Sequence, residues 1–229
     1  MKKLFAAAAV SVAMAVAPAS AGTISFADFA AGNEGGIENR SSVNFDGTVI
    51  TFVSGTGSAA SGRFSTTEFN PYFDDVSGGK PAGVGVCRRL DGPGGVGDTG
   101  ADCFNPGDDS IDGEQGINEM LVLIFSGGFD IRMLSFRDGD HNDINNSSGL
   151  ISWGAYTIAG FIGGTNTFAE LVALAAAGGL QGVNELGLSY VDTDFYLEAV
   201  SDVPIPGAIP LLLSGLAGLG FASRKKKAA

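Results

Sequence analysis

The sequence predicts a mainly β protein, with an antiparallel β-sandwich or jelly-roll-like domain and one short helix. Two observations lead to this fold class. Short runs of β-branched and aromatic residues alternate with turn-forming residues, and the chain carries 36 glycines dispersed along 229 residues. No sequence repeat of fixed period appears, which argues against a solenoid or propeller.

The first expected strand is Thr48 to Val53, directly after Asp46-Gly47, a pair typical of a hairpin turn. The clearest strand pair is Glu119 to Phe125 and Phe129 to Phe136, which are joined through Ser126-Gly127-Gly128. Because glycine accepts a positive φ, this junction predicts a central hairpin.

Three further segments are rich in strand-forming residues. Leu150 to Phe161 predicts one long strand or two broken ones, and Val183 to Val191 and Phe195 to Val200 close the domain. The single expected helix begins at Thr167 to Glu170, which has the spacing of a capping box, and ends at Gly178-Gly179.

Residues 1–21 have the three parts of a secretory signal peptide. Met1-Lys2-Lys3 is the basic region, Leu4 to Ala17 the apolar region, and Ala19 and Ala21 occupy the small positions of an A-x-A cleavage site. We expect the Sec translocon and signal peptidase to process the chain, and the mature protein to begin at Gly22.

The C-terminal segment 203–229 has a different composition from the rest of the chain. A Pro-rich motif leads into the uncharged stretch Ala208 to Ala222, which spans roughly 22 Å as a helix, against about 30 Å for a bilayer core. A basic stop follows, which the positive-inside rule keeps in the cytoplasm. The motif is Val203, Pro204, Ile205, Pro206, Gly207 and Ala208, and the stop is Arg224, Lys225, Lys226 and Lys227.

These three parts resemble the VPLPA-CTERM form of the PEP-CTERM sorting signal of Gram-negative surface proteins. The resemblance implies an exosortase-type membrane protease or transpeptidase as partner, cleavage near Pro206, and a final place at the cell surface, outer membrane or extracellular polysaccharide matrix. A plain C-terminal anchor is the alternative. Residues 22–202 remain as one secreted β-rich domain.

Part of that domain is also similar to exported domains that precede PEP-CTERM tails. The similar segments are Gly83 to Cys87, Cys103, Glu119 to Phe125, Phe136 to His141 and Asp194 to Leu197. This similarity implies the same fold class and compartment and assigns no reaction.

The two predicted signals contain six of the 13 basic residues and none of the 25 acidic residues, so the mature domain carries a net charge near −18. Such a field repels phosphate backbones and anionic headgroups. We therefore expect no nucleic-acid partner; the charge serves solubility or favours cations and neutral sugars.

Cys87 and Cys103 are the two cysteines of the chain, and both lie in the exported part. The periplasm is oxidising, and the segment between them has almost nothing to bury. We expect a disulfide that stabilises this loop.

The densest set of oxygen ligands follows the strand that ends at Phe136. Asp138, Asp140, Asn142 and Asp143 could hold Ca²⁺, which prefers six to eight oxygen ligands. The segment departs from the EF-hand pattern, and the alternative is an acidic β-turn whose side chains bond their own backbone.

A second acidic set surrounds the cysteine loop and could join the first if the fold brings them together; a solvated loop is the default interpretation. Its members are Asp98, Asp102, Asp108, Asp109, Asp112 and Glu114.

Catalysis has little support in the sequence. His141 is the one histidine, and no G-x-S-x-G motif is present. A surface hydrolase would require an acid pair among Glu119, Asp130, Asp138 and Asp140. Trp153 and Tyr156 could stack on a sugar, although aromatic residues in a strand more often belong to the core. The expected role is non-catalytic binding or structure, with a Ca²⁺-dependent carbohydrate-binding module and a surface hydrolase as alternatives.

Overall fold

The computed structural model describes residues 22–57, 64–65, 69–77, 80–95, 101–103, 109–113, 117–157 and 160–202. The predicted signal peptide and sorting tail lie outside the described residues. Within the described ranges, no helix is both long and apolar enough to cross a membrane.

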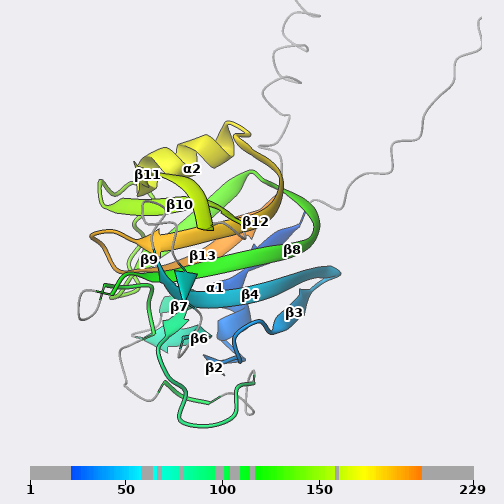
Figure 1. Ribbon diagram of the computed structural model, residues 1–229, viewed down its shortest axis with the longest axis vertical. Coiled ribbons are helices and arrows are strands. Elements are labelled where there is room, and N and C mark those ends of the chain that lie inside the picture. The colour runs from blue at the N-terminus through cyan, green and yellow to red at the C-terminus, as the bar shows by residue number, and fades with distance from the viewer. Residues whose placement is uncertain are drawn as a thin grey trace, which may run out of the picture.

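The domain consists of two antiparallel sheets (Figure 1). The six-stranded sheet has the order β1 (Thr23–Ser25), β13 (Phe195–Ser201), β7 (Lys80–Cys87), β6 (Asn70–Ser77) and β2 (Gly35–Gly36), with β9 (Met133–Asp138) also paired to β13. The seven-stranded sheet has the order β11 (Gly160–Thr167), β10 (Leu150–Thr157), β12 (Leu180–Tyr190), β8 (Glu119–Ile131), β4 (Thr48–Gly57) and β3 (Ser42–Phe45), with β5 (Phe64–Ser65) paired to β4.

The main apolar core takes side chains from both sheets. In β8, Leu121 and Leu123 belong to this core, whereas Met120 and Val122 belong to a separate cluster, as strand alternation requires. An edge-to-face contact of Phe52 in β4 with Phe73 in β6, at 5.4 Å between ring centroids, joins one sheet to the other. The predicted mainly β class is confirmed, and the arrangement is consistent with a β-sandwich.

Local signals predicted several elements correctly. Asp46 and Gly47 have φ values of 48° and 97° and form the turn between β3 and β4. The predicted segment Leu150 to Phe161 contains β10 and the first two residues of β11, and these strands pair as a hairpin. The two strands expected near the end of the domain are β12 and β13.

The predicted central hairpin through Ser126-Gly127-Gly128 is wrong. β8 is one continuous strand of 13 residues that passes through both glycines and lies between β4 and β12. The chain leaves this sheet at Arg132, and β9 pairs with β13 in the other sheet. The second expected strand, Phe129 to Phe136, is therefore divided: its first three residues continue β8, and Met133 to Phe136 belong to β9 in the other sheet.

The physical reason lies in the partners of the second half of β8. Phe129 pairs with Val183 and Ile131 with Leu180, so the continuing strand keeps its backbone bonds to β12. The Phe129 ring also stacks on Phe125 at 4.8 Å. Shifts in the pairing register near Val183 accommodate the glycines as an irregularity of the strand rather than as a turn.

The predicted helix is α2 (Phe168–Ala176), which packs against β9 and β11 (Figure 1). Its capping box is complete: Thr167 Oγ1 accepts from the Glu170 backbone N–H, and the Glu170 carboxylate accepts from the Thr167 N–H. Gly178, with φ of 80°, follows the helix end. The pattern predicted both ends of this element.

The expectation of one helix requires a correction, because the structure has a second, α1 (Phe26–Ala30). Ser25 Oγ caps it by accepting from the Asp28 N–H at 3.0 Å. Five residues are too few to show helical periodicity in a sequence. The buried Phe26 ring contacts Phe45 and Phe52, so tertiary packing rather than intrinsic propensity stabilises this turn.

The predicted disulfide is present between Cys87, at the end of β7, and Cys103. Their Cα atoms are 5.8 Å apart, within the usual range. Tyr72 and Leu90 pack on the bridge. The loop is thereby attached to the six-stranded sheet.

Candidate functional site: an acidic hollow

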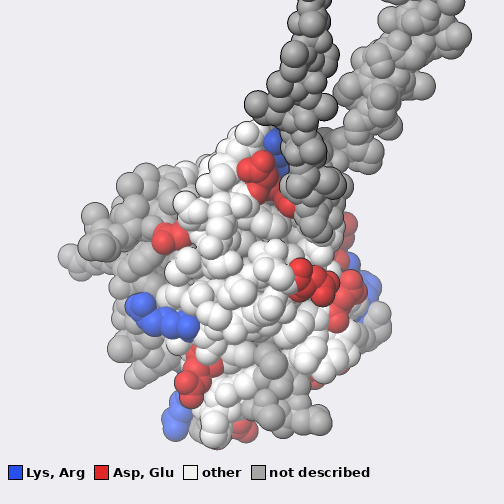
Figure 2. Space-filling model, turned by 90° about the vertical axis from the view of Figure 1, so that its right-hand side faces the viewer, with Lys and Arg blue, Asp and Glu red and all other residues white. Residues whose placement is uncertain are grey.

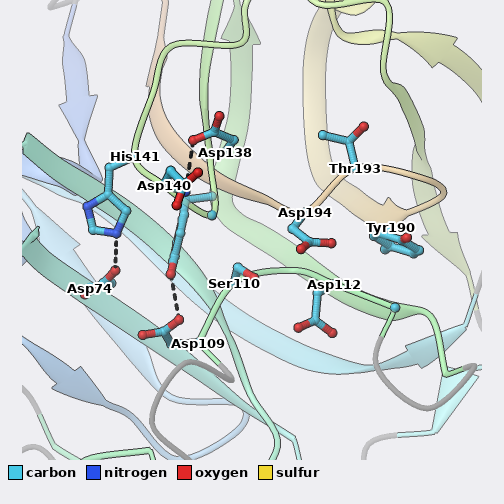
Figure 3. Close-up of a pocket in the computed structure, with 13 residues that line it drawn as sticks. Asp74, Asp109, Ser110, Asp112, Asp138, Asp140, His141, Tyr190, Thr193 and Asp194 are labelled. Carbon is cyan, nitrogen blue, oxygen red and sulfur yellow. Dashed lines mark hydrogen bonds and ion pairs between the residues drawn. The ribbon is translucent and has the colours of Figure 1, made fainter.

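A hollow of about 840 Å³ opens where three connecting segments meet beside the six-stranded sheet (Figure 3). The segments are 109–113, the turn 138–141 that begins at the last residue of β9, and 190–194, which runs from the last residue of β12 to the start of β13. We call it the acidic hollow and define it by its six aspartates: Asp74, Asp109, Asp112, Asp138, Asp140 and Asp194. Its other described lining residues are Ser110, Gly113, Gly139, His141, Tyr190, Thr193 and Tyr196.

The segment 109–113 is held in place by backbone contacts. Ile111 N–H donates to the Phe195 carbonyl at 2.8 Å, and Phe195 N–H donates to the Ile111 carbonyl at 3.2 Å. The segment crosses β7 at Gly85, where a Cβ atom would lie 2.0 Å from the Asp109 carbonyl oxygen. The absence of a side chain at Gly85 therefore places Asp109 and Asp112 at the hollow.

The turn 138–141 is organised by the carboxylate of Asp138. Its Oδ1 accepts from the backbone N–H groups of Asp140, at 3.0 Å, and Asn142, at 2.7 Å. His141 adopts a φ of 61°, and an Arg137 guanidinium N–H donates to its carbonyl at 3.2 Å. This is the side-chain-to-backbone bonding that the sequence suggested as the alternative to calcium.

The four predicted calcium ligands are only partly brought together. Asp138 and Asp140 line the hollow. The Asn142 side chain bonds to Asp138, with Nδ2 3.3 Å from both carboxylate oxygens, but its Oδ1 accepts from Lys80 Nζ at 2.7 Å. Asp143 Oδ1 accepts from the Asn145 N–H at 2.8 Å. Among the described residues, no three His, Cys, Asp or Glu side chains are grouped closely enough to hold a metal ion.

His141 is 3% exposed and uses both ring nitrogens. Nδ1 lies 2.9 Å from the Lys80 carbonyl, and Nε2 lies 2.8 Å from Asp74 Oδ2 (Figure 3). Because a carbonyl only accepts, Nδ1 is the donor to Lys80, and Nε2 faces the Asp74 carboxyl group. Neither nitrogen is left to activate a serine hydroxyl, so this histidine positions the turn against β6 and β7.

Tyr196 forms the inner wall of the hollow. Its hydroxyl donates to Asp109 Oδ1 at 2.6 Å, and its ring meets His141 edge to face at 5.3 Å. Burial, followed by the charges of Asp109 and Asp74, raises the pKa of Tyr196 above its ordinary value. The hydroxyl therefore stays protonated and remains a donor to the carboxylates around it.

Burial also raises the pKa of Asp74, from 3.8 to about 6, with the negative charge of Asp109 adding to the effect and the nearby His141 opposing it. The folded domain thus binds this proton more tightly than the unfolded chain does. The resulting stabilisation is fully present below about pH 4 and is lost as the pH rises through about 6.

We expect Asp109→Asn to lower the pKa of Asp74 and His141→Asn to raise it, because these changes remove a negative and a positive neighbour respectively. A ¹³C NMR titration of the Asp74 carboxyl carbon measures both shifts. Asp91→Asn, which removes an exposed charge of the disulfide loop, serves as the control. A titration midpoint near pH 4 in the wild type would contradict this description.

Two of the carboxylates considered as candidate catalytic residues lie outside the hollow and accept hydrogen bonds from backbone N–H groups. Glu119 is buried, and its Oε2 accepts from the Asp112 N–H at 3.3 Å. Asp130 accepts from the Gly182 N–H at 2.7 Å and lies 3.9 Å from the Arg132 guanidinium. Of the four carboxylates considered for hydrolysis, only Asp138 and Asp140 line the hollow.

Only some members of the second acidic set reach the hollow. Asp109 and Asp112 reach the hollow, whereas the exposed Asp102 belongs to the disulfide loop. Asp98, Asp108 and Glu114 lie outside the described residues.

The aromatic pair belongs to the opposite sheet. Trp153 packs against the main core, and its indole N–H donates to Asn166 Oδ1 at 2.8 Å. This supports the core interpretation for Trp153. The side chain of Tyr156 lies outside the described residues.

Sequence reasoning missed Asp74, Tyr190, Asp194 and Tyr196 as members of the site. Asp74 lies in β6, a strand that the sequence analysis did not propose. Asp194 could have been found from the sequence, because it directly precedes the predicted strand Phe195 to Val200 and polar residues at strand ends often line binding sites. On the face shown in Figure 2, acidic side chains occupy several separate patches, so surface charge alone does not single out the hollow.

No family model, curated protein or solved structure matches this chain.

Proposed function

We propose that this chain is an exported surface or extracellular-matrix protein, sorted and cleaved by an exosortase-type enzyme, whose jelly-roll-like domain has a non-catalytic binding role. The predicted signal peptide and the three-part tail support export and sorting. The Sec translocon, signal peptidase and the sorting enzyme are its processing partners. Its ligand is held at the acidic hollow.

The observation that carries the binding role is the composition of the hollow. Six aspartates face one open space, and none of its described lining residues is lysine or arginine. A concave site lined by one sign of charge concentrates ions of the opposite sign and repels like charges. We infer a cationic or hydroxyl-rich ligand, such as an amino sugar of the extracellular polysaccharide, and no nucleic acid.

The rest of the hollow supports binding more than chemistry. Asp74, His141, Asp109 and Tyr196 bond to one another or to backbone. The backbone amides of the turn donate to Oδ1 of Asp138, and the Asn142 side-chain amide lies 3.3 Å from both of its oxygens. A concave wall with carboxylate charge exposed at Asp140 and Asp194 suits recognition of a ligand.

The double variant Asp138→Asn/Asp140→Asn tests this proposal. Asparagine oxygen still accepts from the turn amides, so the backbone is retained while two charges are removed. We expect chitosan oligosaccharides to bind the variant about three- to tenfold more weakly than the wild type, as isothermal titration measures. Binding of neutral dextran measures recognition of hydroxyl groups without a charge contribution. Anionic alginate should not bind, because the aspartates of the hollow repel it.

The matched control is Asp91→Asn, which removes one exposed charge of the disulfide loop and should bind as the wild type does. If chitosan binding were absent, or equal in all three proteins, the hollow would not be the ligand site.

A Ca²⁺-dependent carbohydrate-binding module is the second candidate. It is favoured because segment 109–113 and the turn 138–141, the two acidic segments that could share a cation, line the same hollow. Hydroxyl oxygens of the sugar would complete the six to eight ligands that the ion takes. Under this candidate, Ca²⁺ raises the melting temperature and dextran retention of the wild type and not of the double variant, whereas Mg²⁺ has no such effect.

A surface hydrolase is the third candidate and has the least support. The imidazole of His141 is occupied at both nitrogens, and Glu119 and Asp130 do not line the hollow.

A further inference from the structure

The first and last residues of the described domain lie side by side. β1 pairs antiparallel with the end of β13, in the register Thr23 to Ser201 and Ser25 to Ala199. The Gly22 backbone nitrogen donates to Asp202 Oδ1 at 2.5 Å, and the Asp202 N–H donates to the Gly22 carbonyl at 3.2 Å. The residue at which the mature chain is expected to begin is therefore bonded to the residue that precedes the sorting motif.

A second pocket, of about 630 Å³, surrounds Gly22 and is separate from the acidic hollow. Its described lining includes Asp28, Asp46 and Asp202 and contains no lysine or arginine. We call it the terminus pocket. Asp202 is half-buried, whereas Asp28 and Asp46 are exposed. This environment favours a positive charge at the nitrogen of Gly22.

Removal of the signal peptide would create that charge. Hydrolysis of the bond between Ala21 and Gly22 consumes one water: its oxygen becomes part of the new carboxylate of Ala21, and the nitrogen of Gly22 becomes a primary ammonium. Before cleavage this nitrogen is a neutral amide. After cleavage, the same nitrogen forms a charge-assisted bond to Asp202.

We propose that the terminus pocket binds the new α-ammonium of Gly22 as an ion pair with Asp202, so that removal of the signal peptide stabilises the strand edge from which the sorting tail departs. The inference rests on the proposed removal of residues 1–21. It depends neither on a ligand at the acidic hollow nor on cleavage of the tail.

The test is a double-mutant cycle on the exported protein, after intact mass has established where the chain begins. One variant is Asp202→Asn. The other inserts Ser-Gly between Ala21 and Gly22, so that the ammonium lies two residues further out. We expect each change to lower the melting temperature at pH 7 by about 1–4 °C, and the two together to cost little more than either one.

The pH dependence adds a second readout. A nearby carboxylate raises the pKa of an α-amine above its ordinary value of about 7.7–8.0. The stabilisation is therefore present below about pH 8 and is lost as the pH rises through the pKa of the folded protein. The difference in melting temperature between the wild type and the insertion variant should disappear at high pH. The control Asp91→Asn should show the same difference as the wild type when the insertion is added to it.

Three results would overturn the proposal: fully additive losses in the cycle, an unchanged melting temperature in both variants, or a mature chain that does not begin at Gly22. Failure of the proposed function is distinguishable from these, because it appears as a retained tail or as absent glycan binding in a protein whose N-terminus behaves as described.

Discussion

Replacing Cys87 and Cys103 together with alanine is expected to lower the free energy of unfolding by about 3 kcal/mol. The bridge closes a sequence separation of 16 residues, and its loss returns that conformational freedom to the unfolded chain. Alanine avoids placing a hydroxyl in the apolar contact with Tyr72 and Leu90. Equilibrium denaturation in urea measures the change.

The folded loop should also lose order, because the bridge ties it to the end of β7. Gly36 N–H donates to the Ala101 carbonyl at 2.9 Å, and Gly95 N–H donates to the Gly36 carbonyl at 2.9 Å. Reduction of the wild-type bridge under the same conditions is the control and should give a similar loss. An unfolding midpoint equal to that of the oxidised wild type would show that the bridge adds nothing to stability.

Replacing Pro204 and Pro206 together with alanine is expected to abolish removal of the tail. Proline removes a backbone donor and disfavours a helix at the residue before it, so we expect the motif to reach the proposed sorting enzyme as an extended handle. Alanine favours continuing the helix, which would draw the cleavage region into the membrane. The full-length variant should accumulate in the inner membrane, where fractionation and intact mass detect it.

Pro93→Ala provides the matched control, because Pro93 is exposed on the disulfide loop and lies outside the motif. Its processing should equal that of the wild type. Equal trimming of the Pro204 and Pro206 variant would mean that the Pro-rich motif is not what the sorting enzyme reads.

The sequence predicted best those elements whose causes are local. Thr167 and Glu170 cap α2 through side chains three residues apart, and Asp46-Gly47 forms its turn through its own backbone preference. Such signals need no knowledge of distant segments. The fold class follows from the same kind of information repeated along the chain.

The wrong hairpin shows where local information ends. Gly127-Gly128 can form a turn or lie within an irregular strand, and the choice depends on whether a partner exists for Phe129 and Ile131. That partner is β12, about fifty residues further along the chain. The long-range pairing decided the outcome, and no local pattern encodes it.

Only part of the acidic hollow could be predicted from the sequence, for the same reason. The turn at Asp138 could be recognised in the sequence because its Asp and Asn residues are close together along the chain. Asp74 meets His141 only because β6, β7 and the turn after β9 are brought together by sheet pairing, across a separation of more than sixty residues. The position of Asp109 depends on the lack of a side chain at Gly85, a steric condition that becomes visible only when the two segments cross.

Export followed by sorting can be tested by measuring the intact mass of the protein recovered from the cell surface and from the culture medium. We expect a chain that begins at Gly22 and has lost the apolar tail after cleavage near Pro206. A wild-type chain that still carries Arg224 to Lys227 would contradict it, because the C-terminal segment would then be a plain anchor.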